Sequence, residues 1–246
     1  MRKNISTLGR ISKYVMLSFF LFTTAVHAGD SCNLSEIEAL KKNIIELAES
    51  YKGQPDQDFS KQKSLDVLVN QLLALAPQPP VAQRLELLYG PWEQVWGPYD
   101  YRNNDRGVDP ELGVDEIYQV IFPDGYYYNV SPLYKKGNRN KERIGLLRGE
   151  FKLDESEPNV LRVQFTSYPG VKPRPTEYAL WELPALAESK ELKNRITIVP
   201  SVVVRLFFGA GALREVYTDE NLRIAYGSNG KNFEDESIYI LRKVKN

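Results

Sequence analysis

One histidine and one cysteine limit the catalytic chemistry that this sequence can support. His27 lies in an N-terminal segment with the features of a secretory signal, so cleavage after Ala28 would leave a mature chain with no imidazole. Ser-His-Asp and Cys-His nucleophile systems need an imidazole partner, and zinc hydrolases take most of their ligands from histidine. The lone Cys32 has no second cysteine for an internal disulfide. The sequence therefore predicts a protein that is not an enzyme and has neither a cofactor nor a metal site.

The first 28 residues carry four basic side chains and no acidic one, followed by an apolar run from Val15 to Val26. This arrangement is typical of a cleaved secretory signal peptide over residues 1–28. The apolar run is also too short to span a bilayer, which takes about 20 residues. We expect an exported protein, with the bacterial periplasm as the first choice of compartment and the plastid as the alternative.

Charge argues against a nucleic-acid partner. The full chain has 32 basic and 32 acidic residues, and loss of the first 28 leaves an excess of acidic side chains. Binding to a phosphate backbone depends on clustered Lys and Arg. Acidic clusters at Asp109 to Glu116 and at Asp154 to Glu157 fall in expected loops, where such carboxylates are usually solvated. We expect no nucleic-acid partner and no carboxylate chemistry.

Residues 29–80 have the pattern of two helices. In the first, apolar residues recur at spacings of three and four, and Asn33 or Ser35 is the expected N-cap. The second is expected to begin at a cap at Ser64 and to end at Pro77. We expect the pair to pack on or cap a larger body, and binding to a partner or to a membrane surface is the alternative.

After the Pro-rich break at residues 77–80, the apolar period changes to two, which is typical of strands. Ten or eleven short strands with no helix pattern between them favour a closed or nearly closed antiparallel β-barrel over residues 81–246. Turn signals lie at residues 123–125 and 227–230. The expected strands are Trp92 to Trp96, Glu116 to Phe122, Tyr126 to Ser131, Arg143 to Leu153, Val160 to Tyr168, Glu177 to Leu183, Arg195 to Val199, Val202 to Phe208, Leu213 to Tyr217, Leu222 to Tyr226 and Ser237 to Val244.

Two segments carry a family resemblance. Residues 214–227, REVYTDENLRIAYG, are similar to the C-terminal signature of the plastid lipid-associated proteins, or fibrillins, and residues 87–96, LLYGPWEQVW, resemble the opening strand of that family. The resemblance implies a lipocalin-like barrel that binds or organises apolar molecules such as lipids, quinones or pigments. The residues that match the family motifs, with structural roles, are Trp92, Tyr217, Asp219, Leu222, Arg223, Ile224 and Gly227.

Aromatic side chains are the candidate lining of such a barrel. The chain has 3 Trp, 15 Tyr and 10 Phe, and aromatic walls with a few polar tips are common in apolar pockets. Plain core packing is the alternative for each ring. A barrel of about eight strands can hold one small ligand if large side chains do not fill it. The candidate ligand-binding residues are Trp96, Tyr118, Phe165, Trp181, Phe207, Arg223 and Tyr226.

The direction of Arg223 depends on its neighbours in the strand. It alternates with Leu222 and Ile224, so it points into the barrel if those two face the helices, and outward if they line the barrel. An inward Arg needs a partner, and Asp219 is the expected carboxylate. The pair would act either as a clamp on the hairpin or as an anchor for a ligand head group.

These observations predict non-enzymatic binding or carriage of an apolar small molecule or lipid in an exported compartment. Peripheral contact with a membrane is left open as a further interaction. The alternative is an envelope structural or protein-interaction module whose barrel is filled by its own side chains. The volume left inside the barrel separates the two functions, because a binder needs a cavity of several hundred cubic ångströms.

Overall fold

The computed structural model describes residues 19–52, 54, 56, 58–97, 112–113, 116–135, 138–172, 175–192, 195–197, 210–228 and 236–245. Side chains are described from residue 33 onward, apart from those of residues 112–113, 133–135, 138–142 and 197. The predicted strand Val202 to Phe208, with the candidate Phe207, lies outside these residues, as does the turn at residues 229–230.

Helices lie mainly at the start of the described chain, and strands follow. The helical elements are α1 (Phe19–Ser50), α2 (Ser60–Leu75), η1 (Val81–Gln83), α3 (Leu85–Leu88), η2 (Leu180–Glu182) and α4 (Leu183–Glu188). The strands are β1 (Gly90–Trp96), β2 (Leu112–Gly113), β3 (Tyr118–Ile121), β4 (Tyr126–Lys135), β5 (Asn138–Leu153), β6 (Val160–Ser167), β7 (Gly170–Val171), β8 (Ile196–Thr197), β9 (Ala210–Thr218), β10 (Leu222–Ser228) and β11 (Ser237–Lys243).

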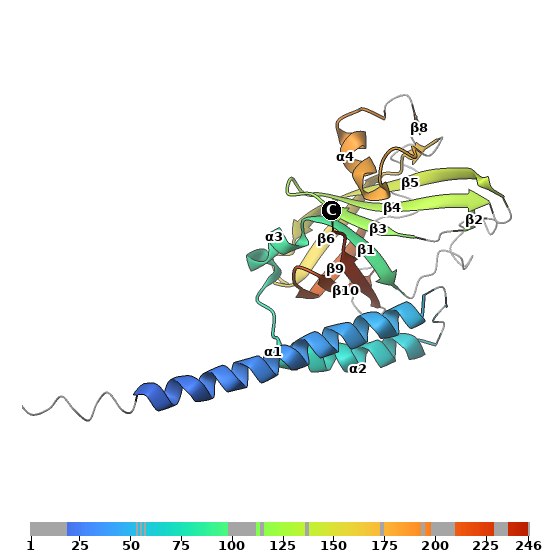
Figure 1. Cartoon of the computed structure of the whole chain (residues 1–246). Coiled ribbons are helices and arrows are strands. Elements are labelled where there is room, and N and C mark those ends of the chain that lie inside the picture. Colours follow the sequence, from blue (N-terminus) through green and yellow to red (C-terminus); the bar gives the residue numbers. More distant parts are fainter. Residues whose placement is uncertain are drawn as a thin grey trace, which may run out of the picture.

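Eight of the described strands close into an antiparallel barrel, in the order β4-β3-β1-β11-β10-β9-β6-β5, and the β4–β5 pairing completes the ring. Strand β2 extends the sheet beside β4, and β7 and β8 branch from β5. Figure 1 shows the barrel with α1 and α2 side by side along one outer side and α4 over another. The predicted mainly β class and antiparallel barrel are confirmed.

The apolar residues form three clusters, two outside the barrel wall and one inside. One outer cluster joins α1 and α2 to β1, β9, β10 and β11, and the other joins η2 and α4 to β3, β4 and β5. The third contains Leu161, Val163 and Leu213 on the inner face, together with residues of η1 and α3. Because side chains alternate along a regular strand, the strand neighbours of an outer-cluster residue face the interior, except at irregularities such as the one between Gln94 and Trp96.

One end of the barrel is closed by η1 and α3, and we call it the α3 end. The side chain of Arg84 is buried there, and it donates to Pro79 O at 3.0 Å and to Thr218 Oγ1 at 2.8 Å. Trp92 is fully buried and donates from Nε1 to Leu88 O at 2.8 Å. The opposite end, where β1, β6 and β10 finish, is called the far end.

Both predicted helices are present, but each begins earlier than its expected cap. α1 runs without a break from Phe19, so Asn33 and Ser35 lie inside it. α2 begins at Ser60 because the buried carboxylate of Asp56 accepts hydrogen bonds from two N–H groups of its first turn. Among the described residues, no helix has both the length and the hydropathy needed to cross a bilayer.

The predicted strand from Glu177 to Leu183 is wrong, because this segment contains η2 and the first residue of α4. Pro184 lies in the first turn of α4, where its fixed φ suits a helix and its missing N–H costs no hydrogen bond. Leu180 and Leu183 are buried against the outer face of β3, β4 and β5. An alternating pattern therefore arose here from a short amphipathic helix. The predicted turn at residues 123–125 is confirmed, with Gly125 at a φ of 90°.

Candidate functional site

Glycines of the inner wall near the far end make room for aromatic rings. Gly227 follows the outward-facing Tyr226 in β10 and therefore faces inward. A Cβ on Gly227 would lie 2.6 Å from Cε2 of Tyr239. A Cβ on Gly97 would lie 2.8 Å from Cδ1 of the same ring. Carbon atoms do not pack this closely, so a side chain at either glycine would clash with Tyr239. The ring of Tyr239 therefore lies directly against the backbone of both glycines.

Two more rings lie on glycines in the same way. Gly145 lies between Ile144 and Leu146 of the outer cluster, so it faces inward, and a Cβ on it would meet Tyr168 Oη at 2.5 Å. A Cβ on Gly149 would lie 3.3 Å from Cδ1 of Phe165. We call Phe165, Tyr168 and Tyr239 the ring wall. Each of its three aromatic side chains packs against glycine backbone of the inner wall.

The structure divides the candidate aromatic residues between the two sides of the wall. Phe165 is on the inner side, among the residues of the third cluster. Trp96 and Tyr226 lie outside, under α1 and α2, and Tyr118 and Trp181 lie outside, beside η2. Trp96, Tyr118 and Tyr226 thus cannot line the barrel, because alternation turns them toward the helices that cover it, and Trp181 belongs to one of those helices, η2.

Arg223 points into the barrel, because Leu222 and Ile224 pack against the helices. Its guanidinium is fully buried and donates to both carboxylate oxygens of Glu215, at 2.9 and 2.5 Å, and to Gln119 Oε1 at 2.8 Å. Burial lowers the pKa of Arg223, but the Glu215 carboxylate more than offsets this and the pKa is raised. The expected partner Asp219 is therefore wrong. We call Arg223, Glu215 and Gln119 the polar layer.

Asp219 instead joins the β9–β10 hairpin to α1. Its Oδ2 accepts a hydrogen bond from the hydroxyl of Tyr217 at 2.9 Å and lies 2.6 Å from Nζ of Lys41. Its Oδ1 accepts from the N–H groups of Asn221 and Leu222, which closes the turn. Burial raises the pKa of Asp219, but these donors and Lys41 lower it further than burial raises it. The family-motif residues Tyr217 and Asp219 thus have structural roles.

Tyrosines on the outer face attach the remaining helices. Tyr226 donates from its hydroxyl to Asp66 Oδ1 of α2 at 2.5 Å, and the guanidinium of Arg214 lies 4.6 Å from the centre of its ring. Burial, and then Asp66, raise the pKa of Tyr226 well above its usual value. On the other side of the barrel, Tyr128 donates to Glu188 of α4. The outward tyrosines therefore hold helices in place.

The interior between the polar layer and the α3 end is filled by side chains. Ile121, Tyr127 and Leu161 are buried there with Trp92. The ammonium of Lys243 lies 4.3 Å from the centre of the Trp92 ring and donates to the backbone oxygens of Leu87 and Tyr89. Burial, and then the positive charge of Arg223, lower the pKa of Lys243 to about 8.

The lowered pKa of Lys243 predicts that the free energy of unfolding depends on pH. Because folding lowers the pKa of Lys243 from 10.5 to about 8, the charged amine opposes folding below pH 8, and this cost disappears as the pH rises toward 10.5. Between pH 7 and 10, the free energy of unfolding should rise by about 1 kcal/mol more in the unmodified protein than in Lys243→Met, allowing for solvent screening. Urea unfolding at both pH values measures it, and an equal change in both proteins would contradict it.

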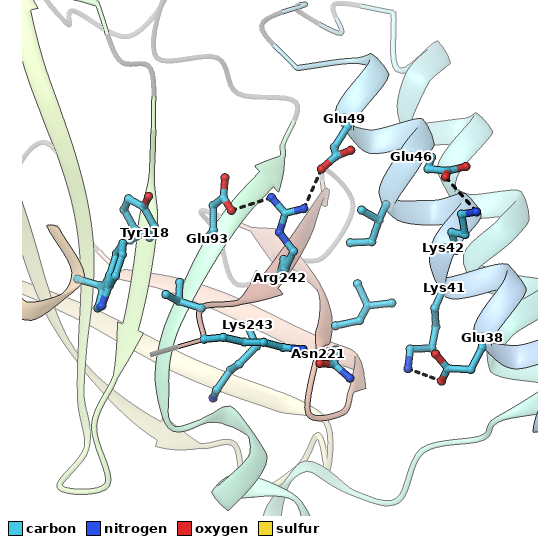
Figure 2. Close-up of a pocket in the computed structure, with 15 residues that line it drawn as sticks. Glu38, Lys41, Lys42, Glu46, Glu49, Glu93, Tyr118, Asn221, Arg242 and Lys243 are labelled. Atoms are coloured by element: carbon cyan, nitrogen blue, oxygen red, sulfur yellow. Dashed lines mark hydrogen bonds and ion pairs between the residues drawn. The ribbon is translucent and has the colours of Figure 1, made fainter. Parts of the chain in front are cut away.

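A cavity with a volume of about 910 Å³ lies outside the barrel, between α1, the end of β11 and η2. We call it the outer groove (Figure 2). It brings Tyr118 and Trp181, two of the candidate ligand-binding residues, into one lining. The residues that line it are Glu38, Lys41, Lys42, Ile45, Glu46, Glu49, Glu93, Tyr118, Trp181, Asn221, Leu222, Arg242, Lys243, Val244 and Lys245.

The fold and these two regions define a class: a mainly β protein built on a closed antiparallel eight-stranded barrel with helices on two outer faces. No protein-family model, no curated protein and no solved structure matches the chain. Within the described residues, no three His, Cys, Asp or Glu side chains gather closely enough to hold a metal ion.

Proposed function

We propose that the protein binds or carries an apolar small molecule, of the kind represented by lipids, quinones or pigments, at the far end of the barrel and does no chemistry on it. The ring wall is the observation that carries this proposal. Phe165, Tyr168 and Tyr239 lie against glycine backbone, so aromatic side chains form part of the inner wall at the far end of the barrel. Flat aromatic surfaces favour apolar ligands, and an eight-stranded barrel has the diameter for one of them.

An open position next to the ring wall adds support. Gly170 of β7 pairs directly with Gly145 of β5, so the two share the inner face, and a Cβ placed on Gly170 meets no described atom within 4 Å. The ligand would therefore lie beside Tyr168, above the polar layer, and the polar layer would form the floor of the site. Arg223 is already held by Glu215 and Gln119 and would not bind the ligand directly.

The second candidate function is a structural or protein-interaction module of the cell envelope. The observation that favours it is the filled half of the barrel. Trp92, the polar layer and the third apolar cluster occupy this half, so no ligand fits there. The two functions differ only at the far end of the barrel. If side chains filled that end as well, the outer surface would be the functional part.

Export and family membership belong to the same proposal. Residues 1–28 have the pattern of a signal peptide, which supports a periplasmic site of action, with the plastid as the alternative. The similarity of residues 214–227 to the fibrillin signature supports a lipocalin-like carrier. The roles of Tyr217 and Asp219 in closing the hairpin give a physical reason why such a signature would persist without contacting a ligand.

The test is uptake of a neutral apolar probe, N-phenyl-1-naphthylamine, measured by its fluorescence. Gly170→Leu adds a side chain where the described structure leaves space, so it should weaken probe binding at least tenfold while leaving the urea midpoint unchanged. Gln164→Leu places the same leucine side chain on the exposed outer face of β6 and is the control. Equal probe binding by the two variants, or no uptake by the unmodified protein, would favour the filled barrel.

A further inference from the structure

The outer groove is large enough for a small molecule and has walls of different character. Its volume of about 910 Å³ falls in the range of small-molecule pockets, roughly 300–1,000 Å³. Figure 2 shows charged side chains of α1 along one wall, Arg242 and Lys243 of β11 in the middle, and Tyr118 at the other end. The groove does not share residues with the ring wall, so a ligand there would be separate from the one in the barrel.

Most charges that line the groove are already neutralised by one another. On α1, Lys41 is held by Glu38 at 2.7 Å, and Lys42 lies 3.6 Å from Glu46. Arg242 bridges Glu49 and Glu93, at 2.8 and 2.9 Å. A ligand has little to gain from these groups, because each cation already has a carboxylate and would have to exchange it.

Two cations at the η2 end of the groove, Lys243 and Lys245, differ from these paired groups. Within the described residues, neither Lys243 nor Lys245 has a carboxylate within ion-pair distance, and they flank Val244 in the chain. Lys243 has only backbone oxygens and the Trp92 ring around its ammonium, and the positive charge of Arg223 lies behind it. Neither positive charge at this end of the groove is therefore paired with a carboxylate of the described chain.

The same end provides an apolar surface. Tyr118 and Trp181 lie with ring centres 5.3 Å apart and tilted by 54°, and Val244 packs against the same outer cluster. Trp181 is only half-buried, so part of its ring is available from the groove. An aromatic face beside an uncompensated positive charge suits a molecule with an apolar part and an anionic end.

We infer that the outer groove is a second binding site, for a small amphipathic anion whose apolar part lies on Trp181, Tyr118 and Val244 and whose anionic group lies near Lys243 and Lys245. A carboxylate or a phosphate head satisfies this chemistry equally. This inference does not depend on the proposed ligand of the barrel, since no groove residue belongs to the ring wall.

Binding of decanoate, decyl phosphate and decanol, each below its micelle concentration, tests the site by calorimetry. Both anions should bind at least tenfold more tightly than the neutral alcohol. A preference between decanoate and decyl phosphate identifies the head group. Equal affinity for all three compounds would overturn the assignment, because the positive charge would then contribute nothing.

Matched variants locate the binding. Lys245→Gln should weaken decanoate binding about threefold to tenfold, since it removes an exposed, uncompensated charge and no buried contact. Lys42→Gln removes a groove charge already paired with Glu46 and should change the affinity less than twofold. Equal effects of the two substitutions would contradict a site at the η2 end.

The fluorescence of Trp181 separates the groove from the barrel. Brominated decanoate should quench Trp181, and Trp181→Phe should abolish most of the quenching, because Trp181 lines the groove whereas Trp92 and Trp96 are buried and do not line it. Gly170→Leu should leave decanoate binding intact. If Gly170→Leu instead abolishes it, the anion binds in the barrel and the groove inference is wrong, while the proposed function of the barrel stands.

Discussion

Glu215→Ala is expected to lower the free energy of unfolding by about 3–5 kcal/mol, the largest effect of any single substitution considered for this protein. The change leaves the guanidinium of Arg223 inside the barrel with only Gln119 as a side-chain partner. A buried charge without its counter-ion carries a large desolvation cost that the folded state cannot relieve. Urea unfolding followed by far-UV circular dichroism measures the loss.

Two controls separate burial from charge. Glu177 forms an exposed ion pair with Arg195 at 2.8 Å, and Glu177→Ala should leave the urea midpoint nearly unchanged, because water screens exposed pairs. A double variant, Glu215→Leu with Arg223→Met, should recover much of the stability lost in Glu215→Ala, because an apolar pair of similar volume needs no desolvation. If Glu215→Ala unfolds at the urea concentration of the unmodified protein, the polar layer is not buried as described.

Ile44→Ala is expected to cost about 2–4 kcal/mol, because α1 is part of the folded body and is not a separate arm. Ile44 of α1 is 0% exposed and packs in the cluster between α1, α2 and the outer face of the barrel. Leu34→Ala on the same helix is the matched control, because Leu34 is 62% exposed, and its loss should stay within about 0.5 kcal/mol. Urea midpoints of the two variants test the difference, and similar midpoints would show that α1 does not pack on the barrel.

Alternation along the chain was enough to predict the barrel but not the direction of its side chains. Leu161, Val163 and Phe165 alternate with polar residues, and the period of two gave the strand correctly. In β11, however, Ile238 and Ile240 face the helices, while Leu241 faces the interior. When helices cover the outer face, both faces are apolar, and the sequence pattern no longer tells which one is inside.

The partner of Arg223 was missed for a similar reason. Asp219 is closer in sequence, but the pairing of β9 with β10 brings Glu215 opposite Ala225, after an irregularity between Ile224 and Ala225. Such a bulge shifts side chains by one position and cannot be read from apolar spacing. One signal for Glu215 was usable, since it lies two residues after Leu213 and therefore shares the inward face of Leu213, before the irregularity.

The ring wall was also only partly predictable. Phe165 was a candidate because it is aromatic and lies in a strand, whereas Tyr168 and Tyr239 were not selected. The signal that could have found them is the set of glycines inside strands, such as Gly145 and Gly227, since a strand glycine often marks the close approach of another group. The pairing of each glycine with its ring required the three-dimensional register.

Carriage of an apolar molecule is tested most directly by native mass spectrometry, with organic extraction, of the protein purified from its own host. A lipid, quinone or pigment at close to one molecule per chain is the predicted result, and Gly170→Leu should lose it while Gln164→Leu keeps it. An unliganded mass, together with no uptake from a mixture of lipids, would contradict carriage and assign the function to the outer surface of a filled barrel.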